Sequence, residues 1–198
     1  QRVLHIGLGG GETTGYLAKL PIDLYLDVVE LEPSIVEAAK KWFDLPSGLN
    51  IHVHTMDGVV FVKEAAAKGI TYNSLILDAG SNSLNASIMC PHEVFLQEDV
   101  MAAMSKVIGA LGVFTVNLYM PEDQERLQEE VTRKFAVHFS SCSALVISEA
   151  SKQKFLMCTN RAGFDWSNQR DRMLAHLAAF DDVMGTKAAP RIDRLNPV

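Results

Sequence analysis

The chain of 198 residues is long enough for one domain with a full hydrophobic core. Apolar residues make up 48% of the chain and charged residues 21%, and no run approaches the roughly 18 apolar residues that a membrane-spanning helix needs. The formal net charge of -6 argues against nucleic acid as a partner, because binding to a phosphate backbone needs a basic face. We therefore expect a single-domain protein that binds neither a membrane nor nucleic acid.

Strand-like and helix-like patterns alternate through the first half of the chain. Short apolar runs that end at polar residues or glycines predict strands, and apolar residues at helical spacing predict helices. Pro21 ends the first helix, Pro33 suits the first turn of the second, and Gly69 closes the third. In chain order we expect a strand at 3–6, a helix at 13–20, a strand at 24–31, a helix at 34–43, a strand at 50–55, a helix at 59–68 and a strand at 74–77.

The second half of the chain continues this alternation and then ends with two adjacent strands and a helix. In chain order we expect a loop at 80–91, a mostly helical segment with a break at 91–108, a strand at 112–118, a helix at 122–135, strands at 143–148 and 154–159, and a helix at 170–184. Only a few polar residues separate the last two strands, so these strands should form an antiparallel pair. The residues after Gly185 are predicted to form a loose tail.

This order predicts an α/β fold with a doubly wound, Rossmann-like sheet, in which five parallel strands precede an antiparallel C-terminal hairpin. No repeat or linker divides residues 1–198, so one domain is expected. Because the chain begins almost inside a strand, we expect it to be a fragment of a longer protein. Ligands of such sheets bind beyond the carboxyl ends of the strands, so the residues at these ends are the candidates for a site.

A glycine cluster, GLGGGETTG, follows the first strand. It fails the nicotinamide fingerprint G-x-G-x-x-G because Glu12 stands at the third glycine position, where its carboxylate would face a pyrophosphate. The cluster also lacks the G-K-[ST] of a phosphate-binding Walker loop. It therefore suits a ligand without phosphates, such as S-adenosylmethionine. The alternative is a tight turn and nothing more.

Acidic residues follow the second and third strands. Glu30 lies about 20 residues after the glycines, where an acid can bind ribose hydroxyls, and Glu32 is a weaker candidate. Asp57, followed by Gly58, is placed to accept a hydrogen bond from the adenine amino group. The alternatives are solvated acids at Glu30 and Glu32 and a common turn at Asp57.

The fourth and fifth strands end at Asp78 and Asn117. The carboxylate of Asp78 could orient an amine nucleophile or receive its proton, and the amide of Asn117 could hydrogen-bond the same amine. Both residues are candidates for catalysis. Local capping of a loop is the alternative for each.

The remaining reactive side chains fit structural roles better. The odd number of cysteines (Cys90, Cys142 and Cys158) indicates reduced thiols, and Cys90 is expected to be a packed thiol rather than a nucleophile. His52 and His54 are expected at the surface, since no cluster has the spacing of a metal site. Four large apolar residues are expected in the core or in a pocket wall: Met89, Met101, Met104 and Trp42.

Six segments carry a family pattern: VLHIGLGGG, DVVELEPSIVEAAKKWF, HTMDGVVFV, SLILDAGSN, MCPHEVFLQEDVM and GVFTVNL. Together they resemble the spermidine-synthase-like branch of the class I S-adenosylmethionine-dependent methyltransferases. Within this branch they are most similar to the C-terminal domain of the eukaryotic dual methyltransferases that modify a lysine and the N-terminal α-amine of elongation factor 1-alpha. The resemblance covers residues 2–160 and includes a terminal hairpin of the predicted kind.

The resemblance implies a cytoplasmic methyltransferase with S-adenosyl-L-methionine as its cofactor and a protein amine, such as that of elongation factor 1-alpha, as its acceptor. It also implies a homodimer, because polyamine synthases of this fold commonly dimerise. Many methyltransferases have an acid two residues before the first glycine, where this chain has His5. The implied cofactor contacts are Gly7, Leu8, Gly9, Gly10, Glu30, Leu31, Asp57, Gly58 and Asp78.

Two other functions remain open. An aminopropyltransferase would use decarboxylated S-adenosylmethionine and a polyamine, and such enzymes have D-S-S-D after the fourth strand. This chain has Asp78-Ala79-Gly80-Ser81, and one acid would hold a multiply charged polyamine poorly. The domain could also bind the cofactor without catalysis and act as an interaction scaffold.

Overall fold

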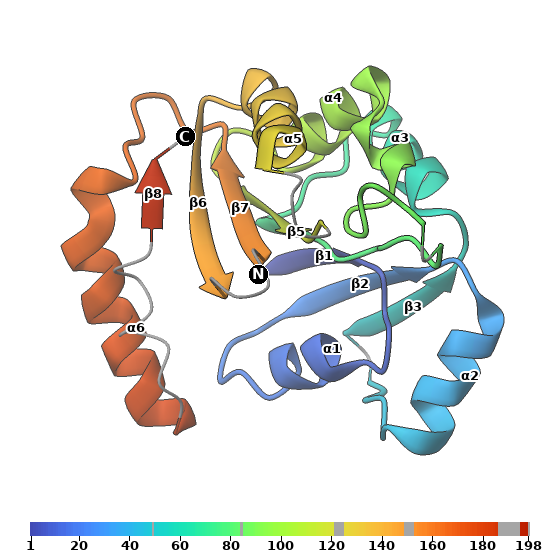
Figure 1. Ribbon diagram of the computed structural model, residues 1–198. Coiled ribbons are helices and arrows are strands. Elements are labelled where there is room, and N and C mark those ends of the chain that lie inside the picture. The colour runs from blue at the N-terminus through green and yellow to red at the C-terminus, as the bar shows by residue number, and fades with distance from the viewer. Residues whose placement is uncertain (49, 84, 121–124, 149–152, 186–194, 198) are drawn as a thin grey trace.

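The computed structural model describes residues 1–48, 50–83, 85–120, 125–148, 153–185 and 195–197. Its eight strands form one sheet in the order β3-β2-β1-β4-β5-β7-β6-β8 (Figure 1). Five parallel strands come first in the chain: β1 (Arg2–Ile6), β2 (Tyr25–Glu30), β3 (Ile51–Thr55), β4 (Ser74–Leu77) and β5 (Val113–Leu118). The predicted doubly wound sheet is confirmed.

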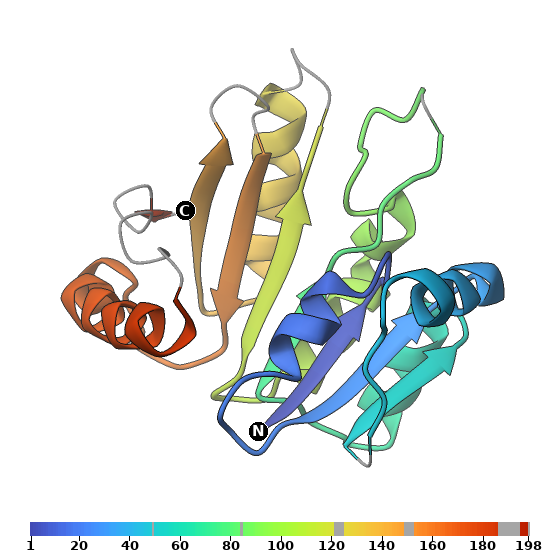
Figure 2. The same cartoon turned by 90° about the horizontal axis from the view of Figure 1, so that it is seen from below.

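The C-terminal strands β6 (Ser141–Ser148) and β7 (Gln153–Thr159) form the predicted antiparallel hairpin. Strand β7 lies between β5 and β6 and runs antiparallel to both, which Figure 2 shows from below. This order places the first residue of β7 at the carboxyl edge of the parallel strands, because Leu118 pairs with Lys154. The hairpin therefore contributes to the edge where ligands of such sheets bind.

Helices cover both faces of the sheet (Figure 1). Two helices, α1 (Glu12–Leu17) and α2 (Pro33–Trp42), lie on one face, and α3 (Gly58–Ala67), α4 (Glu98–Val107) and α5 (Glu125–Val137) lie on the other. A 3-10 helix (Glu93–Leu96) precedes α4, which is the expected break in the segment 91–108. The predicted start of α5 at Glu122 lies outside the described residues. A further 3-10 helix (Ser167–Gln169) leads into α6 (Arg170–Met184).

The hydrophobic core has two layers because the central strands are covered on both sides. In β1, Leu4 and Ile6 belong to the larger layer under α3, α4 and α5, whereas Val3 belongs to the smaller layer under α1 and α2. This burial on both faces explains why residues 3–6 of β1 are apolar apart from His5. Met101 and Met104 lie in the larger layer, as predicted.

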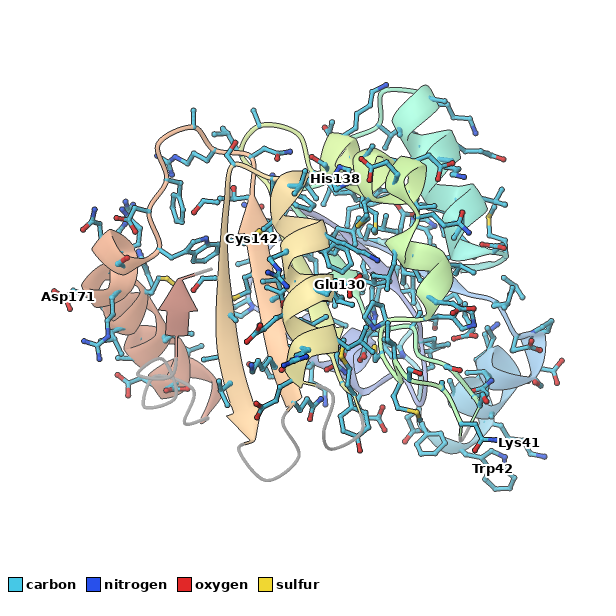
Figure 3. All side chains as sticks on the ribbon, turned by 45° about the horizontal axis from the view of Figure 1, so that its top comes forward. Lys41, Trp42, Glu130, His138, Cys142 and Asp171 are labelled. Atoms are coloured by element: carbon cyan, nitrogen blue, oxygen red, sulfur yellow. A yellow bond between two sulfur atoms is a disulfide. The ribbon has the colours of Figure 1, made fainter. Side chains whose placement is uncertain are left out.

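Trp42 does not lie in the core, because 70% of its surface is exposed. It is the last residue of α2, and Figure 3 shows it with Lys41 at the outer end of the molecule. The ammonium group of Lys41 lies 4.7 Å from the centre of the Trp42 ring, so a cation-π contact replaces core packing.

The tail and the histidines also differ from expectation. Leu195–Pro197 forms a short strand, β8, against β6, although the sequence predicted a loose tail; three residues are too few to show an alternating pattern. His52 and His54 are partly buried rather than surface residues. The ring of His52 lies 4.8 Å from that of Tyr25, and Nε2 of His54 lies 2.8 Å from Oδ1 of Asp27.

Asp27 is the centre of a buried polar cluster within the sheet. It is 3% exposed, and its Oδ2 accepts hydrogen bonds from Tyr72 Oη at 2.9 Å and Arg2 Nη2 at 3.2 Å. His54 approaches the other carboxylate oxygen. Burial and the adjacent Asp27 carboxylate raise the pKa of Tyr72 well above its usual value, so its hydroxyl stays protonated and can donate. These contacts satisfy a charge that would be costly to bury alone.

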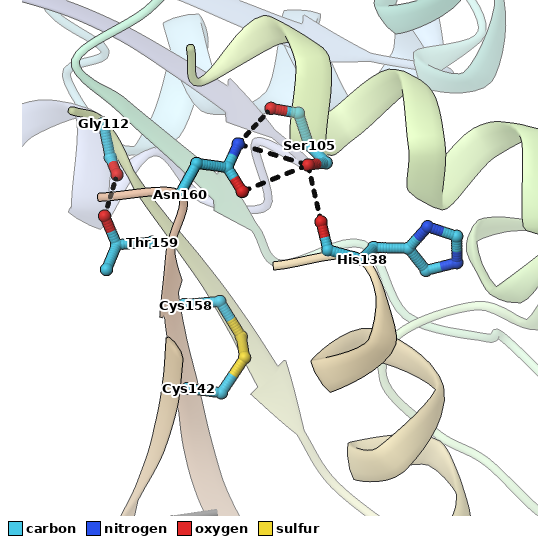
Figure 4. Close-up of a disulfide and its surroundings, with 7 residues drawn as sticks. All are labelled: Ser105, Gly112, His138, Cys142, Cys158, Thr159 and Asn160. Carbon is cyan, nitrogen blue, oxygen red and sulfur yellow. Dashed lines mark hydrogen bonds between the residues drawn. A yellow bond between two sulfur atoms is a disulfide. The ribbon is translucent and has the colours of Figure 1, made fainter. Parts of the chain in front are cut away.

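Cys142 and Cys158 form a disulfide between β6 and β7, so the expectation of three reduced thiols is wrong (Figure 4). The two residues are 16 positions apart in the chain and pair directly across the hairpin. Their spacing alone gave no sign of a bond, since it is the register of the strands that brings them together. Cys90 is free and buried, as predicted, and burial raises the pKa of its thiol. Among the described residues, no helix is long and apolar enough to cross a membrane.

Candidate functional site

The glycine loop turns sharply between β1 and α1. Gly7, Gly9 and Gly11 all have positive φ angles, of 94°, 54° and 88°, which side chains with a Cβ rarely adopt. A Cβ on Gly7 would also collide with the carbonyl oxygen of Asp78, so glycine lets the loop lie against the end of β4. At Gly9, by contrast, no atom lies within 4 Å of the Cβ position. The loop thus presents open backbone at Gly9 while packing tightly at Gly7.

The carboxylate of Glu12 lies over the loop. A Cβ on Gly10 would be only 2.7 Å from its Oε1. A phosphate placed on this loop would therefore meet a negative charge close to the backbone. This observation supports the prediction that the ligand of the loop has no phosphate.

Glu30, at the end of β2, contacts the glycine loop directly. Its Oε2 accepts a hydrogen bond from the backbone N–H of Leu8 at 2.9 Å, and its Oε1 accepts one from the N–H of Glu32 at 3.0 Å. The side chain of Leu31 is 60% exposed beside it, while Glu32 precedes α2 and is exposed. Each carboxylate oxygen of Glu30 can accept a second hydrogen bond, as binding of ribose hydroxyls requires.

Asp57 and Gly58 follow β3 at the same edge of the sheet. Oδ1 of Asp57 accepts hydrogen bonds from the N–H groups of Val59 and Val60, so this carboxylate caps α3. Asp57 thus has a structural role as a helix cap, and its Oδ2 makes neither of these capping contacts. Gly58 is buried against Ile6, and a Cβ at this position would be only 2.7 Å from the Ile6 side chain.

Asp78 and Asn117 lie side by side at the ends of β4 and β5. Nδ2 of Asn117 donates to Oδ1 of Asp78 at 2.9 Å, and the thiol of Cys90 lies 3.8 Å from the same oxygen. Asp78 itself is exposed, so its carboxylate faces the solvent side of this edge. The two predicted catalytic candidates therefore form one unit.

Gln153 is a member of the site that the sequence analysis missed. Its Nε2 donates to Oδ1 of Asn117 at 2.9 Å, which extends the row Asp78–Asn117 onto the C-terminal hairpin. The predicted hairpin could have indicated this residue. A strand that runs antiparallel to its neighbour begins at the edge where that neighbour ends. We define these three residues as the amide row.

His5 lies beneath this edge in β1 and is 1% exposed. Neither of its ring nitrogens has a hydrogen-bonding partner among the described residues, and the same holds for the buried hydroxyl of Thr14 in α1. Burial lowers the pKa of His5 to about 4, although Asp78 and Glu30 act in the opposite direction. His5 is therefore neutral at physiological pH and cannot replace the acid that many methyltransferases have at this position.

Several groups at this edge have the chemistry that an adenosine ligand without a phosphate needs. The open backbone of the glycine loop can accept a close approach of the ligand, Glu30 can take ribose hydroxyls, and Asp57 can take an amine. Glu12 disfavours a phosphate-bearing ligand. All of these groups come from the loops after β1, β2 and β3, which is the edge of an open sheet where ligands bind.

Known proteins resemble the chain in sequence, although no family model matches it. An "eEF1A lysine and N-terminal methyltransferase homolog" of Drosophila pseudoobscura is 35% identical over 117 residues, which cover 59% of this chain and 17% of that protein. A "Polyamine aminopropyltransferase" of Vibrio vulnificus is 32% identical over 119 residues, 60% of this chain and 40% of that protein. The chain thus spans less than half the length of these relatives.

The solved structures show the fold. Human methyltransferase-like protein 13 in complex with SAH superimposes with a TM-score of 0.82 and 22% identity over 94% of this chain and 82% of that one. Spermidine synthase from Thermotoga maritima gives a TM-score of 0.66 and 17% identity over 83% of this chain and 55% of that one.

The fold is that of the class I methyltransferases and spermidine synthases, as the sequence predicted. Within this class, the chain is similar in sequence to the eEF1A lysine and N-terminal methyltransferases and to a polyamine aminopropyltransferase.

Proposed function

We propose that this domain transfers a methyl group from S-adenosyl-L-methionine to a protein amine. One observation carries the proposal: the exposed carboxylate of Asp78 is held by the Asn117 amide at the edge where the glycine loop and Glu30 meet. The names of the relatives support methyl transfer. The glycine loop, Glu30, Leu31, Asp57 and Gly58 would hold the cofactor.

The proposed roles of the protein groups follow from their chemistry. When bound, S-adenosylmethionine supplies an electrophilic methyl group, so the protein has mainly to position the amine and exclude water. Oδ1 of Asp78 is occupied by Asn117, which leaves Oδ2 to accept a hydrogen bond from the amine and to take up its proton. An α-amine, with a pKa of about 8, is partly neutral at physiological pH, whereas a lysine at about 10.4 would need a stronger base. One carboxylate therefore suits an α-amine better.

The loop after β4 argues against a polyamine as the acceptor. At Gly80, a Cβ would be 2.7 Å from the carbonyl oxygen of Met89, and the N–H of Ser81 donates to that same oxygen at 2.7 Å. A serine at position 80 would thus require the backbone to move. This loop presents one acid, Asp78, and a polyamine with several charges would be left with unpaired cations.

Elongation factor 1-alpha is the acceptor that the names of the relatives suggest, through its N-terminal α-amine or a lysine. A cytoplasmic location and a homodimer complete the proposal as predictions. Disulfides are rare in a reducing cytoplasm, so the bond between Cys142 and Cys158 bears on the predicted location. Mass spectrometry of the protein isolated under thiol-blocking conditions would show whether the bond is present.

The test is transfer of a radiolabelled methyl group to proteins of a cell lysate and to a peptide with a free N-terminal glycine. Wild-type protein should label the peptide, and Asp78→Asn should reduce labelling at least about 100-fold. Asp171→Asn is the matched control, because Asp171 is exposed at the start of α6, which Figure 3 shows at the left margin of the molecule. Turnover of putrescine with decarboxylated cofactor would instead identify an aminopropyltransferase. Absence of binding to both S-adenosylmethionine and SAH in calorimetry would reject an enzyme.

A further inference from the structure

We propose that Gln153 is a positioning residue that fixes the orientation of the Asn117 amide and, through it, the free oxygen of Asp78. The inference rests on the proposed function, which places the acceptor amine next to the amide row. Its basis is the pair of 2.9 Å contacts that join the three side chains in one line across β4, β5 and β7.

The chemistry of the row allows only one direction of hydrogen bonding. An ionised carboxylate can only accept, so Asn117 must turn its NH2 group to Asp78. The carbonyl oxygen of Asn117 then faces Gln153, which must offer its own NH2 group. Asp78 thus sets the orientation of the Asn117 amide, and the hydrogen bond from Gln153 adds a second contact that favours this orientation.

This arrangement explains why a residue of the C-terminal hairpin belongs to the site. Gln153 is partly buried at the start of β7, and its NH2 group is the partner of the Asn117 carbonyl oxygen. With Oδ1 of Asp78 engaged by Asn117, the carboxylate presents Oδ2 in one fixed position. A row of one carboxylate and two amides suits a single amine next to a peptide group, because amides can pair with peptide N–H and C=O groups.

Substitution by glutamate gives the sharpest test. In Gln153→Glu, a carboxylate would face the Asn117 oxygen, and turning the Asn117 amide over would place that oxygen against Asp78 instead. In either orientation of the Asn117 amide, its oxygen would therefore face a carboxylate, which is repulsive. Gln153→Leu only removes the donor. We therefore expect transfer to the N-terminal glycine peptide to fall about 10-fold in kcat/KM for Gln153→Leu and at least about 100-fold for Gln153→Glu.

The control separates the row from general effects of charge. Gln97→Glu makes the same substitution at an exposed residue before α4 that has no side-chain hydrogen bond to that helix, and it should leave kcat/KM within about 2-fold. In an Asn117→Ala background, Gln153→Glu should lose most of its additional effect, because the group that it acts through is gone. An equal loss in both backgrounds, or unchanged transfer by Gln153→Glu, would overturn the proposal. Affinity for SAH should change by less than about 2-fold in both Gln153 variants, since Gln153 does not touch the glycine loop.

A readout independent of methyl transfer distinguishes this inference from the proposed function. The side-chain amide signals of Asn117 in a ¹⁵N–¹H spectrum should shift in Gln153→Glu and remain in place in Gln97→Glu. If wild-type protein transfers no methyl group but these signals shift, the proposed function fails and the role of Gln153 in orienting Asn117 stands. If transfer is present and the signals do not shift, the role of Gln153 is rejected.

Discussion

Glu30 and Leu8 are joined by a 2.9 Å hydrogen bond from a backbone N–H to a carboxylate, which ties the end of β2 to the glycine loop. Because the carboxylate both shapes the loop and faces the proposed ribose position, its loss should weaken cofactor binding more than it weakens the fold. We predict that Glu30→Gln lowers affinity for SAH at least about 10-fold in calorimetry, since a hydrogen bond to a charged group contributes about 1.5–3 kcal/mol. Glu37→Gln, at an exposed position of α2, should leave affinity unchanged. Equal affinities of the two variants would show that Glu30 is not a cofactor contact.

The glycines differ in what they tolerate. Gly7→Ala combines a φ of 94° with a collision at the Asp78 carbonyl, so it should lower the free energy of unfolding by more than about 2 kcal/mol and abolish SAH binding. Gly15→Ala lies in α1 with no atom within 4 Å of the new Cβ, so it should stabilise the protein by up to about 1 kcal/mol. Urea denaturation of both variants measures the difference, and a destabilised Gly15→Ala variant would contradict this account of the loop.

His5 predicts a loss of stability in acid. Its pKa is about 4 in the folded protein, against about 6.5 in the unfolded chain, so the unfolded state binds more protons below pH 6.5. The stabilisation is complete above about pH 6.5 and is lost as the pH falls toward 4, by roughly 3 kcal/mol. His5→Val should flatten the pH dependence of the free energy of unfolding over this range. The free energy of unfolding is measured by denaturant titration at pH 4.5, 5.5 and 6.5. If it depends on pH equally in wild type and His5→Val, His5 is not the group responsible.

The Asp27 cluster predicts a purely structural effect. Asp27→Ala would leave the buried hydroxyl of Tyr72 and the guanidinium of Arg2 without their acceptor, and we expect a loss of about 3–5 kcal/mol in stability. Asp171→Ala, on an exposed face of α6, should change stability by less than about 0.5 kcal/mol. Thermal unfolding followed by circular dichroism compares the two variants. A similar melting temperature for both would mean that the cluster contributes little.

Local patterns were sufficient for most of the fold. Strand β4 and helix α6 begin and end where the sequence predicted them, and the pairing of β6 with β7 followed from their short connection. The candidates at the strand ends also lie at one edge, because parallel strands share the direction in which they end. These features depend on spacing along the chain, which a sequence displays directly.

The features that the sequence did not reveal depend on register across strands. Cys142 meets Cys158, and Gln153 meets Asn117, only because β7 is placed between β5 and β6 in one particular alignment. The exposure of Trp42 has a different cause, since α2 ends at this residue and leaves its ring beyond the sheet. Apolar character alone could not separate the last turn of a helix from its buried middle.

The position of β7 also has a consequence for synthesis on the ribosome. While residues up to 118 have emerged, β5 is the unpaired edge of a parallel sheet, and its partner arrives only when residues 153–159 follow. Until then, the apolar strand Val113–Leu118 offers its backbone to any other extended chain. During this period of synthesis, aggregation of the nascent protein competes with folding. A chaperone that binds the exposed strand would protect the protein until β7 pairs with it.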